Sequence, residues 1–112
     1  MLRAYRAANM RRLTAEQALE SAFHIGQAYA FADRGAEALQ SFRDADADTA
    51  PEEWRAFVAA HVAFFSHDRA ALARARARYA AAAHADAMRL GFIEGMLKCP
   101  DKSYMEAVSC AS

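Results

Sequence analysis

The sequence predicts an all-α fold, and three observations lead to that class. More than a quarter of the 112 residues are alanine, the best helix former, whereas only four are glycine and two are proline. β-Branched residues, which favour strands, are few. Apolar residues also recur three and four positions apart, as they do on the buried face of a helix. At this length the chain is expected to form a single domain, residues 1–112, around one modest core.

Five to six helices are expected, and capping residues mark most of their starts. They cover about 14–32, 36–46, 50–65, 69–83 and 86–97, with a short last helix from 103. Capping boxes open the first, third and last of these helices, and their members are Thr14 with Gln17, Thr49 with Glu52, and Ser103 with Glu106. Asp68 is the expected N-cap of the fourth helix. Residues 1–13 hold four arginines and no acid, and we interpret them as an N-terminal basic helix rather than a targeting presequence.

The run "ALARARARYAAAAHA", residues 71–85, suggests a strand at first, because three arginines alternate with alanines. Alanine and arginine are good helix formers, however, and the run has no β-branched residue. On a helix its apolar residues form one stripe, which consists of Ala71, Leu72, Ala75, Tyr79 and Ala82. Arg74 and Arg78 flank the stripe on one side and Arg76 on the other. We therefore predict a helix whose arginines face the acidic segment 44–53.

The chain repeats itself when it is shifted by 33 residues. This shift pairs Ala30 with Ala63, Phe31 with Phe64, and Leu39 with Leu72, and a partial third copy follows at Leu90-Gly91. Residues 22–45, "AFHIGQAYAFADRGAEALQSFRDA", resemble the tetratricopeptide repeat, which places L-G-x2-Y in its first helix and A-x3-F in its second. Ile25, Gly26 and Tyr29 fit the first part of this pattern, and Ala38 and Phe42 fit the second. The second copy is degenerate.

The resemblance implies stacked antiparallel helix hairpins that form an α–α superhelix. Its repeats would be 14–48 and 49–83, with a partial third repeat at 84–111. It also implies a partner-binding groove made by the first helix of each pair. Transfer of the family's groove positions selects Phe23, Gln27, Phe31, Ala60 and Phe64. The lysine and asparagine clamp by which some members hold a peptide carboxylate is missing, so we expect an apolar or basic ligand, for which a helix is one candidate form.

Several kinds of chemistry are not expected. The net charge is zero and no helix-turn-helix signature occurs, so nucleic acid is not a predicted partner. No apolar run is long enough to span a membrane. The four histidines show no HxxxH or HExxH spacing and no Cys/His cluster, so we predict no metal, no cofactor and no catalytic residue. His61 lies among phenylalanines and is expected to be a buried, hydrogen-bonded structural residue.

Cys99 and Cys110 are eleven positions apart and form no CxxC motif. A bridge between two terminal helices is geometrically feasible. Reduced thiols in a cytoplasmic protein are nevertheless the favoured interpretation.

The leading functional hypothesis is a non-enzymatic interaction module that binds a protein or peptide partner through an apolar and aromatic groove. One alternative is a self-associating structural protein, a homodimer in which Phe31 and Phe64 are core or contact residues. The other is a metal protein or enzyme that uses His61 and His67.

Overall fold

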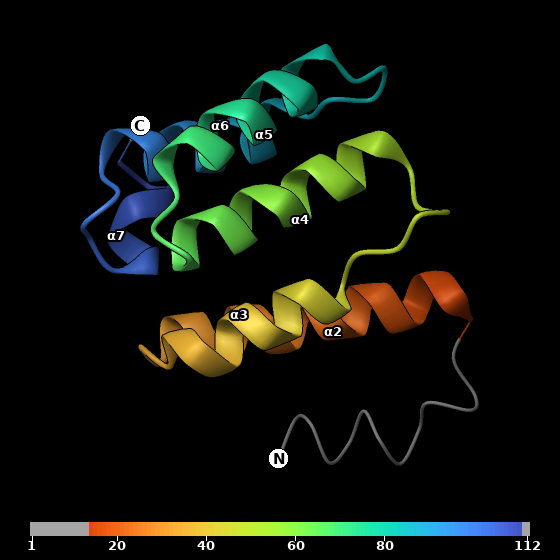
Figure 1. Cartoon of the computed structure of the whole chain (residues 1–112), viewed down its shortest axis with the longest axis horizontal. Coiled ribbons are helices and arrows are strands. Elements are labelled where there is room, and N and C mark those ends of the chain that lie inside the picture. Colours follow the sequence, from red (N-terminus) through yellow and green to blue (C-terminus); the bar gives the residue numbers. More distant parts are fainter. Residues whose placement is uncertain (1–13, 111–112) are drawn as a thin grey trace.

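The computed structural model describes residues 14–110, and within that range the chain contains six helices and no strand (Figure 1). The helices are α2 (Ala15–Phe31), α3 (Gly35–Asp44), α4 (Glu52–Phe65), α5 (Arg69–Ala81), α6 (Ala87–Lys98) and α7 (Tyr104–Val108). This confirms the all-α class, and the helix ends lie within two residues of the predicted ones. The basic helix predicted for residues 1–13 falls outside the described residues. None of the helices described here combines the length and the apolarity that crossing a lipid bilayer requires.

Side chains begin most of the helices as the sequence predicts. At Thr14 the capping box is complete, because its hydroxyl accepts from the Gln17 N–H at 3.1 Å and the Gln17 side chain accepts from the Thr14 N–H at 3.1 Å. The Asp68 carboxylate accepts from the Ala71 N–H at 3.0 Å. At α7 the Ser103 hydroxyl accepts from the backbone N–H of Glu106, while that glutamate accepts the serine hydroxyl proton instead of a backbone N–H.

The capping box predicted at Thr49 is wrong. α4 begins at Glu52, its N-cap is Pro51, and no side chain caps it. The Glu52 side chain has another partner, because Arg78 of α5 donates to both of its carboxylate oxygens at 2.9 and 3.0 Å. A carboxylate engaged by a bidentate guanidinium does not turn back to the backbone of Thr49.

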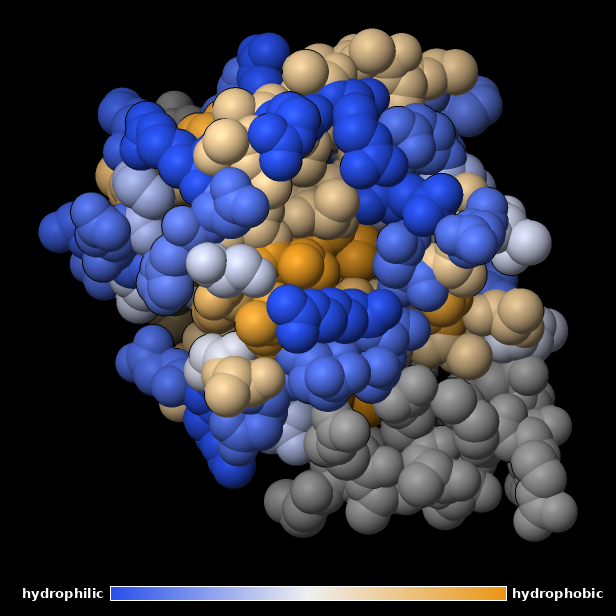
Figure 2. Space-filling model, viewed as in Figure 1, coloured by the Kyte–Doolittle hydropathy of each residue, from blue (hydrophilic) through white to orange (hydrophobic). Residues whose placement is uncertain are grey.

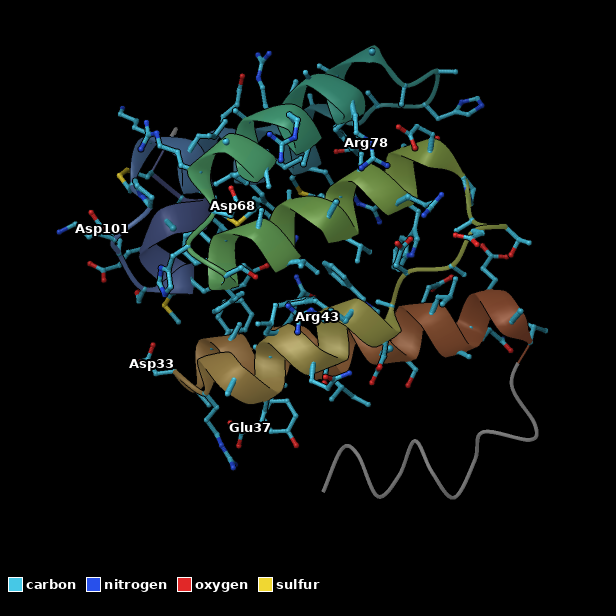
Figure 3. All side chains as sticks on the ribbon, viewed as in Figure 1. Asp33, Glu37, Arg43, Asp68, Arg78 and Asp101 are labelled. Carbon is cyan, nitrogen blue, oxygen red and sulfur yellow. A yellow bond between two sulfur atoms is a disulfide. The ribbon has the colours of Figure 1, made fainter. Side chains whose placement is uncertain are left out.

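Successive helices pack against one another: α2 pairs with α3 and α4 with α5 in antiparallel hairpins, and a third hairpin is formed by α6 and the short α7 that packs on it (Figure 1). Other contacts skip elements: α4 also packs on α6, α2 packs on α7, and Tyr104 of α7 contacts His61 of α4. The turn inside each of the first two hairpins contains one residue in the left-handed region, Asp33 with φ 58° and His67 with φ 55°. These two residues are 34 positions apart, one more than the shift read from the sequence. Asp33 and Asp101 come from the first and third hairpins and lie at the same end of the molecule (Figure 3).

Aromatic rings fill the core where the hairpins meet. The Phe23 ring contacts the rings of Phe42 and Phe57 at centroid distances of 5.2 and 5.3 Å. Phe42 reaches this position because Gly26 has no side chain: a Cβ there would lie 2.8 Å from the Phe42 ring. Small residues at helix crossings thus leave the volume that the larger rings occupy.

The arginine run is helical as predicted, but its helix ends at Ala81, two residues before the predicted end, and Ala82 of the predicted stripe lies outside it. The stripe faces the core, with Leu72, Ala75 and Tyr79 buried. The expectation for the arginines is met in part. Arg78 pairs with Glu52 in the acidic segment, whereas Arg76 donates to Glu94 of α6 at 2.8 Å. Figure 3 shows Arg78 beside the start of α4.

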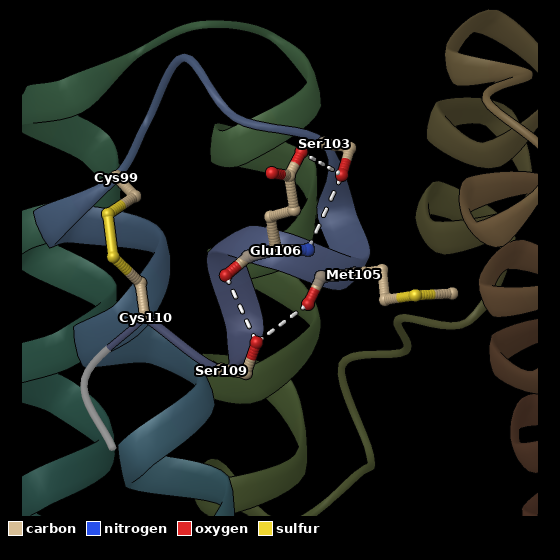
Figure 4. The surroundings of a disulfide bond; sticks show 6 residues. All are labelled: Cys99, Ser103, Met105, Glu106, Ser109 and Cys110. Atoms are coloured by element: carbon tan, nitrogen blue, oxygen red, sulfur yellow. Dashed lines mark hydrogen bonds between the residues drawn. A yellow bond between two sulfur atoms is a disulfide. The ribbon is translucent and has the colours of Figure 1, made fainter.

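The expectation of reduced thiols is wrong, because Cys99 and Cys110 form a disulfide (Figure 4). Their Cα atoms are 6.3 Å apart, within the range that such a bond spans. The chain turns back after Lys98, and α7 packs so closely on α6 that a Cβ at Gly95 would overlap the carbonyl oxygen of Ala107. This close approach brings the two cysteines together.

Candidate functional site

The first helix of each hairpin contributes one face to a shared groove, which has a volume of about 770 Å³. Four aromatic side chains line it, namely Phe23 of α2, Trp54 and Phe57 of α4, and Phe92 of α6. The α3–α4 connection closes one side. The single tryptophan of the chain therefore lies in this groove, where its indole N–H donates to the Ala45 carbonyl at 2.8 Å.

The lining residues occupy equivalent positions of the three helices. Phe23, Phe57 and Phe92 follow one another at intervals of 34 and 35 residues. The same intervals relate Glu20, Trp54 and Arg89, and also Leu19, Glu53 and Met88, all of which line the groove. Three helices thus present equivalent positions to one groove. Between α2 and α4 this register pairs Gln27 with His61, whereas the shift of 33 pairs Gln27 with Ala60.

Acidic side chains dominate the charge around the groove. Glu16 and Glu20 are exposed and Glu53 is half-buried, and all three line the groove. Among residues 14–110, the one guanidinium in the lining belongs to Arg89, which lies 5.2 Å from the centre of the Phe57 ring and 6.0 Å from that of Trp54. The site therefore combines an aromatic floor with an excess of negative charge, a combination that suits an apolar segment with basic residues.

The far half of the same face is closed by α7. Tyr104 is 2% exposed and inserts between α2 and α4. Its ring lies 5.2 Å from that of Phe31, 5.8 Å from that of Phe65 and 6.4 Å from that of Phe64. Its hydroxyl accepts a hydrogen bond from the Gln27 amide at 3.2 Å and donates to Nε2 of His61 at 2.8 Å. The chain's own last helix therefore occupies the second half of the groove.

His61 is fully buried, and both of its nitrogens have partners. Nδ1 lies 2.9 Å from the Phe57 carbonyl, which can only accept, so this nitrogen carries the proton and Nε2 accepts from Tyr104. Burial lowers the pKa of His61 to about 4. Burial also raises the pKa of Tyr104 to about 12, against the opposing hydrogen bond from Gln27. The buried and hydrogen-bonded role predicted for His61 is confirmed.

Both ring nitrogens of His61 are therefore engaged by other residues of the protein. His67 lies exposed in the α4–α5 turn, away from this pair. Across residues 14–110, no group of three or more histidine, cysteine, aspartate or glutamate side chains is placed to hold a metal ion.

Four of the five residues predicted for partner binding border one or both halves of the groove. Phe23 lines the open half, and Gln27 borders both halves. Phe31 and Phe64 lie against Tyr104; Phe31 is 50% exposed and Phe64 is buried. Ala60 is fully buried and lines neither half.

The residues that the sequence did not single out for the site include Trp54 and Phe57 of α4 and Phe92 of α6, together with Tyr104. The recurrence of Phe23, Phe57 and Phe92 at 34 and 35 residues is a signal that could have identified the floor. Nothing local to the sequence around Tyr104 points to α2, because the contact joins segments 77 residues apart.

A second hollow, of about 470 Å³, lies on the opposite side of α4, between α3 and α5. Its floor is aliphatic, with Val58 and Val62, and Arg43, Arg74 and Arg78 are among its rim residues. Figure 2 shows this apolar surface at the centre of the face, surrounded by hydrophilic residues. It is smaller than the groove, and none of the described residues that line it is aromatic.

Comparison with known proteins gives no family assignment: no family model matches the chain, and no curated protein or solved structure is significantly similar to it.

Proposed function

We propose that the protein is a non-enzymatic interaction module of tetratricopeptide-like stacked hairpins, which binds a basic, apolar helical segment of a partner protein. The observation that carries the proposal is the groove between α2, α4 and α6, with its aromatic floor and acidic surroundings. An amphipathic helix uses such a groove by inserting apolar side chains at one-turn intervals, while its basic residues face the carboxylates.

Two features support the repeat architecture. The left-handed turn residues Asp33 and His67 are 34 positions apart, which is the length of a tetratricopeptide repeat. Gly26 and Ala38, which the repeat pattern places where two helices touch, are both buried at the α2–α3 crossing. The third hairpin departs from the pattern, since its second helix, α7, has only five residues.

The proposal is tested by a titration that uses Trp54 as the reporter. Because Trp54 is the single tryptophan and lines the groove, a ligand bound there changes its emission directly. The probe is a synthetic helical peptide without tryptophan, with leucines at positions i, i+3, i+4 and i+7 and lysines elsewhere. We expect saturable binding that weakens with salt, because the rim is acidic.

Met88 and Met105 offer a matched pair of variants. Both are exposed, at 65% and 60%, but only Met88 lines the groove. Met88→Lys should lower the affinity for the basic peptide at least tenfold, because it adds a positive charge beside the apolar floor. Met105→Lys should leave this affinity unchanged. No saturable change in the Trp54 emission, or equal effects of the two variants, would remove the groove as the binding site.

Self-association is the second candidate, and one observation favours it. Phe31 and Met105 are exposed large apolar residues on α2 and α7, two helices in contact with each other. Light scattering at several concentrations separates the candidates. A homodimer that Phe31→Glu dissociates would support self-association through this surface, whereas a monomer at all concentrations would exclude it.

The disulfide bears on the proposed location. Persistent disulfides are rare in the cytoplasm, where those that occur are mostly transient or redox-sensing. We therefore propose a cytoplasmic location on one condition, namely that the Cys99–Cys110 disulfide is reduced and reformed in the cell.

A further inference from the structure

α7 is a short helix whose one large buried side chain is Tyr104. It has five residues, of which Tyr104 and Ala107 are buried while Met105 and Glu106 are exposed. An isolated helix of this length is not stable in water, so contacts elsewhere must hold it in place. Those contacts are Tyr104 in the groove, the packing of Ala107 on Gly95, and the disulfide.

The disulfide closes a loop from Cys99 to Cys110 that contains the whole of α7. Cys99 follows α6 directly and Cys110 lies two residues after α7, so both ends of the connection and helix are fixed at one point (Figure 4). Closing a loop of this length restricts the undocked segment and reduces its population by a factor on the order of 100. Both cysteines are partly exposed, so a thiol can reach the bond.

The surface under α7 is an extension of the open groove. Without Tyr104, the side chains of Gln27, Phe31, His61 and Phe64 would lose their common neighbour. Gln27 already lines the open half, so the two halves are continuous. The uncovered part would present an aromatic pocket with an amide donor and a neutral imidazole acceptor, which match a phenol hydroxyl. It fits a partner helix that carries a tyrosine.

We propose that α7 is a redox-controlled occupant of the groove: the Cys99–Cys110 disulfide holds it in place, and reduction allows a tyrosine-bearing partner helix to take its position. The consequence for binding rests on the proposed function, but the release of α7 does not.

The reductant is a dithiol, either small or part of a protein. Its thiolate attacks one sulfur of the disulfide, a mixed disulfide forms, and the other cysteine leaves as a thiolate that takes up a proton. The second thiol of the reductant then attacks the mixed disulfide and releases the remaining cysteine. Two electrons and two protons pass to Cys99 and Cys110, and the reductant becomes an intramolecular disulfide.

Hydrogen exchange of the full chain tests the release of α7 without any ligand. The wild-type protein is compared with and without dithiothreitol, and Cys99→Ser/Cys110→Ser is measured under the same two conditions. We expect the hydrogen-bonded amides of α7, such as the Ala107 N–H that donates to the Ser103 carbonyl, to exchange on the order of 100-fold faster once the bond is reduced, while those of α4 keep their protection. The double variant should behave as the reduced wild type does, with or without dithiothreitol.

Equal exchange of α7 in the oxidised and reduced proteins would overturn the proposal. So would loss of protection in α4 on reduction, because the disulfide would then hold the whole fold rather than one segment. Faster α7 exchange supports the release even if the basic peptide binds neither form, in which case the proposed function alone is lost.

Discussion

Lowering the pH from 7 to 5 should destabilise the protein through His61. This residue is fully buried as the neutral form, and its pKa is about 4 in the folded chain against an ordinary value of 6.5. Between these two values the unfolded chain binds a proton that the folded chain excludes, so stability falls as the pH falls. This difference in pKa lowers the free energy of unfolding by about 2 kcal/mol between pH 7 and pH 5, and by about 3 kcal/mol between pH 7 and pH 4.

Urea unfolding at pH 7, 6 and 5 measures this loss. The comparison is between the wild-type protein and His61→Gln, which keeps a neutral polar side chain that does not titrate. His84→Gln, a change at an exposed histidine, controls for the substitution itself. We expect the wild type and His84→Gln to lose about 2 kcal/mol more than His61→Gln between pH 7 and pH 5. Parallel losses in all three proteins would show that His61 is not the group responsible.

Two further predictions concern packing and hydrogen bonding, and urea unfolding followed by circular dichroism checks both. Tyr104→Phe should cost about 1–3 kcal/mol, because the buried Nε2 of His61 loses its donor; no loss would mean that this hydrogen bond is not formed. Gly26→Ala should destabilise by about 1–3 kcal/mol, since its Cβ would lie 2.8 Å from the buried ring of Phe42. Gly91→Ala is the matched control, with no neighbour within 4 Å of the added Cβ, and should stabilise by up to about 1 kcal/mol. Equal effects of the two glycine substitutions would refute the close contact at Gly26.

Much of the fold could be predicted because the signals for helices are local. The caps at Thr14 and Asp68 bond backbone groups three residues away, and both were correct. The run at 71–85 was recognised as helical because helix propensity and the apolar stripe agreed, against the alternation of its arginines. The structural role of His61 followed from its aromatic neighbours in the sequence.

The groove could be predicted only in part. The sequence identified Phe23 and Gln27 on α2, but the corresponding positions of α4 depend on the register between the hairpins. A shift of 33 selects Ala60, whereas the turns at Asp33 and His67 set the interval at 34 and bring His61 to the equivalent place. One residue of error rotates a position by about 100° around a helix, which is enough to move it from the groove into the core.

Local sequence was sufficient for the helices, for their boundaries to within two residues and for the inward stripe of the arginine run, because these depend on backbone and side-chain interactions within one or two turns. The tertiary structure alone decided that Glu52 binds Arg78 instead of capping α4, that Cys99 and Cys110 meet, and that Tyr104 closes half of the groove. Each of these contacts joins different elements or the two ends of a connection. These contacts stabilise the protein only once the hairpins pack together, so they cannot be predicted from the residues next to each partner in the sequence.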